Sequence, residues 1–377
     1  MKTKLKICFV ATVDVAITVF LANHLRQLAK FYDLTVITNA SNPEFLSEIR
    51  VDATFVQMKF SREITLFADF YCLIMLIQIF MKNRFASVHS ITPKAGLLAI
   101  LAARICFIPI RVHTFTGQVW ATKTGLIRSF LKFFDKLIAK MTTHNLVDSA
   151  SQRTFLIEEG VLSPGKALVF GSGSVAGVDL KKFKANNSFN SVMRKHLAIP
   201  KDGFVYLFLG RLVEEKGVLD LARAFSKIKD SNAYLVFVGS DEAKLSTHIL
   251  NICSYKTKYI RVLGFSKKPY KYLALANVLC LPSYREGFGS VIIEAAATGI
   301  PAIASNIYGI SDAIVNQKTG LLHQPKDIKA IICAMQNFLK DPRLVKRYGH
   351  AAKKRVQLEF DANILSKYWL NFYKTNL

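Results

Sequence analysis

Two glutamates flank a glycine-rich segment in the second half of the chain. Glu286 and Glu294 have seven residues between them, among them Gly287, Gly289 and Ser290. A helix is predicted to begin at Ser290, and the free N–H groups of a helix N-terminus bind anions. A carboxylate beside a diphosphate is repelled unless sugar hydroxyls donate to it. The spacing therefore predicts a clamp on a nucleotide sugar, Glu294 on the ribose and Glu286 on the transferred sugar. The alternative is a pair of surface charges.

A second group of chemically capable residues precedes this segment. Arg211 and Lys216 lie in the sequence 209–217, directly after an apolar predicted strand over 204–209. Arginine offers a forked contact and lysine a point charge to oxyanions. The two cations and the glycine-rich segment together predict a diphosphate site, although a solvated turn would show the same residues.

The elements that must position these residues alternate between strand and helix. In the first half we predict strands over 6–11, 34–38, 87–90 and 111–114, with helices over 17–31 and 92–103. After a predicted polar surface loop over 184–193, the pattern restarts with strands over 204–209, 234–238, 259–262, 278–281 and 301–304, and a helix over 218–228. Buried strands alternating with helices indicate an α/β fold with parallel, doubly wound sheets.

The glycine- and serine-rich stretch 170–179 is typical of a linker. It divides the chain into a first domain over 1–175 and a second over 176–360, and we expect a helix over 361–377 to return to the first. Ligands of such sheets bind at the carboxyl ends of the strands, so a site facing a cleft between the domains is expected.

The motifs resemble those of glycosyltransferase family 4. The resemblance rests on Gly-Arg-Leu-x-x-x-Lys-Gly at 210–217 and Glu-Gly-Phe-Gly-x-x-x-x-Glu-Ala at 286–295. It implies a retaining enzyme with the GT-B fold, two Rossmann-like domains with parallel sheets facing a cleft.

The resemblance also implies roles for individual residues. Arg211 and Lys216 would bind the diphosphate, Glu294 the ribose and Glu286 the donor sugar, and His113 would lie near the transferred sugar. The remaining donor-binding residues would be Gly264 and Phe265 at the base, and Gly287, Phe288, Gly289 and Ser290 through their backbones. The loop at Thr12, Val13 and Asp14 departs from the family by lacking glycine, which leaves its phosphate contact open.

The sequence holds no Asp-x-Asp motif and no His/Cys cluster with metal-ligand spacing. Lysine, arginine and a helix N-terminus can neutralise a leaving diphosphate, so we expect no divalent metal and no cofactor. No residue stands out as a covalent nucleophile.

The net charge of +25 requires polyanionic partners. The segment 123–140 is predicted to be an amphipathic helix whose basic residues, Arg128, Lys132, Lys136 and Lys140, bind an anionic membrane surface. The alternative is a helix packed on its own domain. Six cysteines without a Cys-x-x-Cys pair, and no uninterrupted apolar run of about 18 residues, favour a cytoplasmic protein, peripheral on the inner face of the cell membrane.

The segment 113–120 is similar to that of the bacterial members that build surface polysaccharides, such as lipopolysaccharide O-antigen, and glycans on lipid carriers. The expected function is transfer of a sugar, UDP-N-acetylhexosamine being the favoured donor, to a lipid-linked glycan. A nucleotide-sugar epimerase on the same fold and a basic nucleic-acid-binding protein are the alternatives.

Overall fold

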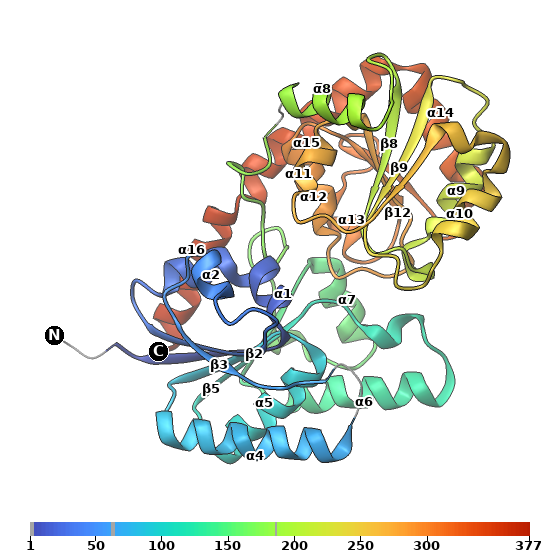
Figure 1. Cartoon of the computed structure of the whole chain (residues 1–377). Coiled ribbons are helices and arrows are strands. Elements are labelled where there is room, and N and C mark those ends of the chain that lie inside the picture. The colour runs from blue at the N-terminus through green and yellow to red at the C-terminus, as the bar shows by residue number, and fades with distance from the viewer. Residues whose placement is uncertain (1–3, 62–64, 185–186) are drawn as a thin grey trace. The chain divides into compact units, whose positions relative to one another are not determined.

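The computed structural model describes residues 4–61, 65–184 and 187–377, and they form two compact units. Unit 1 comprises Met1–Gly177 and Ala362–Leu377, and unit 2 comprises Val178–Asp361 (Figure 1). The boundaries predicted from composition, after residues 175 and 360, lie within two residues of these positions. Each unit is described by itself below.

Unit 1 is built on a seven-stranded parallel sheet with the order β3-β2-β1-β4-β5-β6-β7. The strands run over β1 Lys6–Val13, β2 Asp33–Asn39, β3 Thr54–Gln57, β4 Ser87–Ser90, β5 Ile110–Phe115, β6 His144–Val147 and β7 Ala167–Leu168. Strand β1 is buried almost throughout, which is why it reads as a continuous apolar run.

Helices cover both faces of this sheet. One face carries α4 Leu66–Asn83, α5 Pro93–Ile105, α6 Gly125–Met141 and α7 Ala150–Glu158 (Figure 1). The other carries α2 Ala22–Leu28 and the C-terminal helix α16 Ala362–Asn376, which therefore returns to unit 1. Shorter helices are α1 Asp14–Ala16, η1 Ile17–Leu21, α3 Phe45–Glu48, η2 Val119–Thr122 and η3 Pro164–Lys166.

Unit 2 contains a six-stranded parallel sheet with the order β10-β9-β8-β11-β12-β13. The strands run over β8 Phe204–Leu209, β9 Ala233–Val238, β10 Ile260–Leu263, β11 Val278–Leu281, β12 Ala302–Ser305 and β13 Gly320–His323. The strand order reverses between β8 and β11, and ligands of open parallel sheets bind at such a switch point.

The helices of unit 2 follow the strands in turn. They are α8 Asn187–His196, η4 Glu214–Lys216, α9 Val218–Ser226, α10 Ser246–Ile252, η5 Ser254–Tyr259, α11 Pro269–Leu273, α12 Ser290–Ala297, α13 Ile310–Ala313, α14 Ile328–Lys340 and α15 Pro342–Glu359. The nine predicted strands are all present, but β3, β6, β7 and β13 were not predicted. The alternation of strand and helix agrees with the prediction, so both units are Rossmann-like.

Helix α8 corrects one prediction, because 184–193 was expected to be a polar loop. The reason is tertiary, since Arg194 donates hydrogen bonds to Asn190 and to the backbone carbonyls of Pro200, Gly203 and Leu275. These contacts fix a helix whose composition alone favours a loop.

Helix α4 contains Asp69 and Lys82, in agreement with the prediction that no uninterrupted apolar run reaches about 18 residues. It is the one helix, among the described residues, that is long and apolar enough to cross a membrane.

Candidate functional site

The predicted residues of the second half lie on the loops that follow β8, β10 and β11. Arg211 and Lys216 follow β8, and Glu286 lies between β11 and α12. Strands β8 and β11 are neighbours, so these three residues lie at the switch point of the sheet. The sequence predicted the strand ends correctly, but it did not show that these two strands are adjacent.

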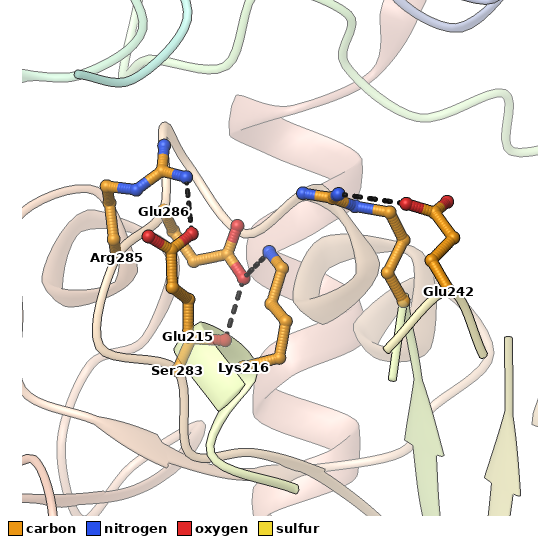
Figure 2. Close-up of polar contacts among 7 residues, drawn as sticks. Glu215, Lys216, Glu242, Ser283, Arg285 and Glu286 are labelled. Atoms are coloured by element: carbon orange, nitrogen blue, oxygen red, sulfur yellow. Dashed lines mark hydrogen bonds and ion pairs between the residues drawn. The ribbon is translucent and has the colours of Figure 1, made fainter. Parts of the chain in front are cut away.

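Lys216 and Glu286 form a direct ion pair (Figure 2). The Lys216 ammonium lies 2.5 Å from the Glu286 carboxylate, whose same oxygen accepts a hydrogen bond of 2.8 Å from the Ser283 hydroxyl. Both charged side chains are largely shielded from solvent, with exposures of 19% and 12%. The pair joins the predicted diphosphate contact to the predicted sugar contact, and Ser283 was not predicted.

Arg211 is held more loosely. Its guanidinium lies 3.6 Å from the Glu242 carboxylate, and both side chains are about half exposed (Figure 2). Exposed pairs of this kind contribute about 0–1 kcal/mol. Arg211 can therefore exchange Glu242 for an anionic ligand at little cost, as its predicted role requires.

Helix α12 begins at the glycine-rich segment with an open N-terminus. Gly289 precedes it with φ of +72°, a left-handed conformation that favours glycine, and no side chain caps the helix. Phe288 is buried and packs its ring on Phe360, with ring centroids 5.4 Å apart. Only the backbone of Phe288 is therefore available to a ligand, in agreement with the predicted backbone contacts.

Glu294 lies in the second turn of α12. It is half-buried, and among the described residues its carboxylate has no hydrogen-bond or ion-pair partner. Burial raises the pKa of Glu294 to about 7, although the nearby Lys182 lowers it in part. A carboxylate that has lost water without gaining a protein donor is suited to accept hydrogen bonds from ligand hydroxyls.

Gly264 and Phe265 directly follow β10, at the edge of the sheet. The Phe265 side chain is 73% exposed, and Gly264 has open space around it. An exposed aromatic ring at a strand end offers a stacking surface, which is consistent with the predicted contact to a base.

The loops after β8 and β11 are fastened to each other. Gly217 adopts φ of +66°, and a Cβ atom there would lie 2.1 Å from the carbonyl oxygen of Pro282. Arg285 pairs with Glu215 at 2.7 Å, and the Tyr284 N–H donates to the Glu215 carbonyl at 2.8 Å (Figure 2). This second ion pair could not be predicted from the sequence, since its partners are 70 residues apart.

His113 lies in β5 of unit 1 and is buried. A ring nitrogen, Nδ1, is 2.8 Å from the Ser90 hydroxyl, and the ring packs against Gly96, where a Cβ atom would lie 2.5 Å from it. Burial lowers the pKa of His113 to about 3, so the imidazole is neutral near pH 7. The role of His113 beside the transferred sugar stays a prediction. In that role the neutral imidazole would act through a hydrogen bond rather than as a cation.

The residues Thr12, Val13 and Asp14, predicted to form a loop, are instead the end of β1 and the start of α1, and Thr12 is tied to the residue that precedes α5. The Thr12 N–H and hydroxyl lie 2.8 and 2.7 Å from the Thr92 hydroxyl. The Asp14 carboxylate accepts hydrogen bonds from the N–H groups of Val15 and Ser41. The polar side chains of this segment thus stabilise unit 1, and a phosphate contact through Thr12 or Val13 stays open.

The basic residues of α6 do not all face solvent. Arg128 and Lys132 pair with Glu159 at 2.6 and 2.5 Å and lie over the ring of Trp120. Lys136 and Lys140 are exposed. For Arg128 and Lys132 the packed-helix alternative therefore holds, because Glu159 lies within reach on the neighbouring helix end.

No three His, Cys, Asp or Glu side chains within the described residues are arranged to hold a metal ion. The expectation of a metal-independent reaction stays a prediction.

Comparison with known proteins identifies both halves of the chain. The family described as "Glycosyl transferases group 1" matches residues 190–355, and "Glycosyl transferase 4-like" matches residues 6–145. The capsular polysaccharide biosynthesis glycosyltransferase CapM of Staphylococcus aureus is 32% identical over 84% of this chain and 83% of its own length. An Escherichia coli UDP-Gal:alpha-D-GlcNAc-diphosphoundecaprenol alpha-1,3-galactosyltransferase is 30% identical over 82% of this chain and 81% of its own.

A solved structure shows the same fold. Anabaena Alr3699/HepE, crystallised in complex with UDP-glucose, has a TM-score of 0.83 over 98% of this chain and 100% of its own, at 16% identity.

Proposed function

Because this chain belongs to glycosyltransferase family 4 and is a glycosyltransferase with the GT-B fold, we propose that it transfers a sugar from a UDP-linked donor to a lipid-linked glycan. The observation that carries the donor half is the Lys216–Glu286 ion pair at the β8/β11 switch point. It places a cation for the leaving diphosphate and a carboxylate for sugar hydroxyls within one hydrogen bond of each other.

The diphosphate is bound by Arg211, Lys216 and the N-terminus of α12. Two cations and the positive end of a helix stabilise the negative charge that develops on the leaving diphosphate. Glu294 accepts hydrogen bonds from the ribose, and Phe265 lies against the base. The solved relative with UDP-glucose and the Escherichia coli relative named for UDP-Gal support UDP as the nucleotide.

The acceptor half of the proposal rests on the relatives. The Escherichia coli relative acts on a diphosphoundecaprenol-linked sugar, and CapM is named for capsular polysaccharide biosynthesis. We extend this to a polyprenyl-diphosphate glycan for this chain, reached at the cytoplasmic face of the membrane. The reaction proceeds with retention at the anomeric carbon and without a divalent metal.

A transfer assay tests these points together. The protein is incubated with an undecaprenyl-diphosphate-linked sugar and one donor at a time: UDP-GlcNAc, UDP-GalNAc, UDP-Gal or UDP-Glc. We expect UDP release and a longer glycan with one donor, the N-acetylhexosamines being the prediction from sequence, and an unchanged rate in EDTA. Anomeric proton couplings of the product report retention. UDP release that does not lengthen the acceptor glycan, or isomerisation of the donor sugar, would contradict the proposal.

A further inference from the structure

Unit 1 exposes an apolar surface on the outer sides of α4 and α6. We define the aromatic face as Phe67, Phe70 and Ile74 of α4 together with Leu126, Phe130 and Phe133 of α6. Phe67 is 94% exposed and Leu126 is 88% exposed. Single exposed apolar residues are common, but three on each of two helices that both pack on α5 are more than scattered exposure.

The spacing shows that the exposure is built into α4. Its buried residues Cys72, Leu76 and Phe80 recur every four positions and pack in the core with α5. Phe67, Phe70 and Ile74 recur on the opposite side of the same helix. Helix α4 is thus apolar on both sides, with one side in the core and the other in solvent.

The exposed charges on α4, α5 and α6 are of one sign, and they lie in the second halves of these helices, beyond the aromatic face. Helices α4, α5 and α6, all fully described, carry two carboxylates: Asp69 pairs with Lys94 at 2.6 Å, and Asp135 is buried, where it accepts a hydrogen bond from Trp120. The exposed charged residues on these helices are basic: Lys82, Arg104, Lys136 and Lys140. An occupant of the face must therefore be apolar and bounded by negative charge, which describes an anionic lipid bilayer.

The face also lies where a lipid-borne acceptor is needed. Helix α4 follows β3 and α6 follows β5, so both begin on the side of the carboxyl ends of the strands. The residues of the aromatic face occupy the first halves of both helices. That edge of a parallel sheet is where ligands bind.

We propose that the aromatic face seats unit 1 on an anionic bilayer, with α4 and α6 lying in the plane of the lipid–water interface. Helix α4 does not cross the membrane, because Cys72, Leu76 and Phe80 hold its other side in the core of unit 1. The inference builds on the proposed function, in which the acceptor is lipid-borne. It assigns membrane contact to aromatic residues, with Lys136 and Lys140 as the electrostatic supplement.

Vesicle co-sedimentation tests the proposal, using phosphatidylglycerol/phosphatidylcholine vesicles. The variants are Phe67→Ser with Phe70→Ser, and Leu126→Ser with Phe130→Ser; the matched control is Val192→Ser with Leu358→Ser, two exposed apolar positions of unit 2. We expect each face variant to bind at least tenfold more weakly, and the control to bind as the unchanged protein does. Lys136→Ala with Lys140→Ala should weaken binding to anionic vesicles only.

A fluorescent variant gives a second readout that does not depend on loss of binding. Trp120 and Trp369 are both 1% exposed, so Phe67→Trp adds an exposed tryptophan. Its emission should shift to the blue when vesicles are added.

Equal vesicle binding by all variants, or no blue shift, would overturn the proposal. So would a concentration-dependent dimer that the same serine substitutions dissociate, since the face would then be covered by a second copy. Transfer to a short water-soluble acceptor separates the two proposals. If the unchanged protein binds vesicles through this face but transfers no sugar, the proposed function fails and the docking surface stands.

Discussion

At the scale of single residues, Lys216 is the contact on which we predict the diphosphate site to depend. Its ammonium lies in a shielded position against Glu286, so a leaving diphosphate would meet it with little competing water. Interactions with a charge that develops in the transition state are worth about 2–4 kcal/mol. Lys216→Ala should therefore lower the transfer rate about 30- to 1000-fold.

The rate is measured as UDP release with saturating acceptor. Lys201→Ala, at an exposed lysine of the same unit, is the control. If a folded Lys216→Ala variant transferred sugar at a rate within threefold of the unchanged protein, Lys216 would not be a diphosphate contact.

Glu294 is predicted to make donor affinity depend on pH. Its pKa is raised to about 7 by burial in the free protein, and the ionised form is the stronger acceptor for ribose hydroxyls. Donor binding should therefore require deprotonation, and the dissociation constant of the UDP-sugar should rise about tenfold from pH 8 to pH 6. Calorimetric titration at both pH values measures it.

Glu294→Gln should weaken binding at pH 8 and remove the pH dependence. Glu44→Gln, at an exposed glutamate of unit 1, should leave both unchanged. If the dissociation constant of the Glu294→Gln variant still rises from pH 8 to pH 6, another group causes the pH dependence.

At the scale of elements, two loops act as one because charged pairs bridge them. The Arg285–Glu215 pair lies beside the Lys216–Glu286 pair and joins the same two chain segments. Arg285→Ala and Glu215→Ala should each raise the KM for the UDP-sugar about threefold or more, because Lys216 and Glu286 lose their fixed spacing. Coupled pairs commonly show interaction energies of about 0.5–3 kcal/mol.

The exchanged pair, Arg285→Glu with Glu215→Arg, tests positioning against direct contact. Recovery of KM in the exchanged variant supports a positioning role. If the double alanine variant loses as much as the sum of the single variants, the two residues act independently.

The sequence predicted nine strands of the two sheets because buried parallel strands are continuous apolar runs, as in 204–209. It missed β3, β6, β7 and β13, which are four residues or shorter and which each include partly exposed residues. It predicted Arg211, Lys216, Glu286 and Glu294 at strand and helix ends because turn glycines mark those ends. It missed Ser283 and the Arg285–Glu215 pair because their partners meet only through the adjacency of β8 and β11. It missed α8 because that helix depends on the tertiary hydrogen bonds of Arg194. It missed the aromatic face because that face depends on which side of a helix the core occupies.

At the scale of the whole molecule, the last helix of the chain completes unit 1 through buried histidines. Trp369 of α16 stacks between the rings of His24 and His89, with centroids 4.7 and 4.9 Å away. His24 is hydrogen-bonded to Ser366, and His89 to Tyr373. All these side chains are buried, so the attachment of α16 depends on neutral imidazoles.

This attachment should weaken in acid. Burial lowers the pKa of His24 to about 4, and the pKa of His89 is also lowered, mainly by burial. A histidine with a lowered pKa in the folded state stabilises the fold fully above its unfolded value of about 6.5, and that contribution is lost as the pH falls toward the folded value. Each histidine that becomes protonated on opening then costs about 1.4 kcal/mol per pH unit below 6.5.

Hydrogen exchange of the α16 backbone amides between pH 7 and pH 5, corrected for the intrinsic rate, measures the free energy of opening. We expect this free energy to fall over that range. His24→Gln should reduce the slope, because one titrating group is gone, while lowering protection at pH 7, because the stacking on Trp369 is lost. His350→Gln, at an exposed histidine of unit 2, should change neither. Protection of α16 that is constant from pH 7 to pH 5 would show that the helix is held by apolar packing alone.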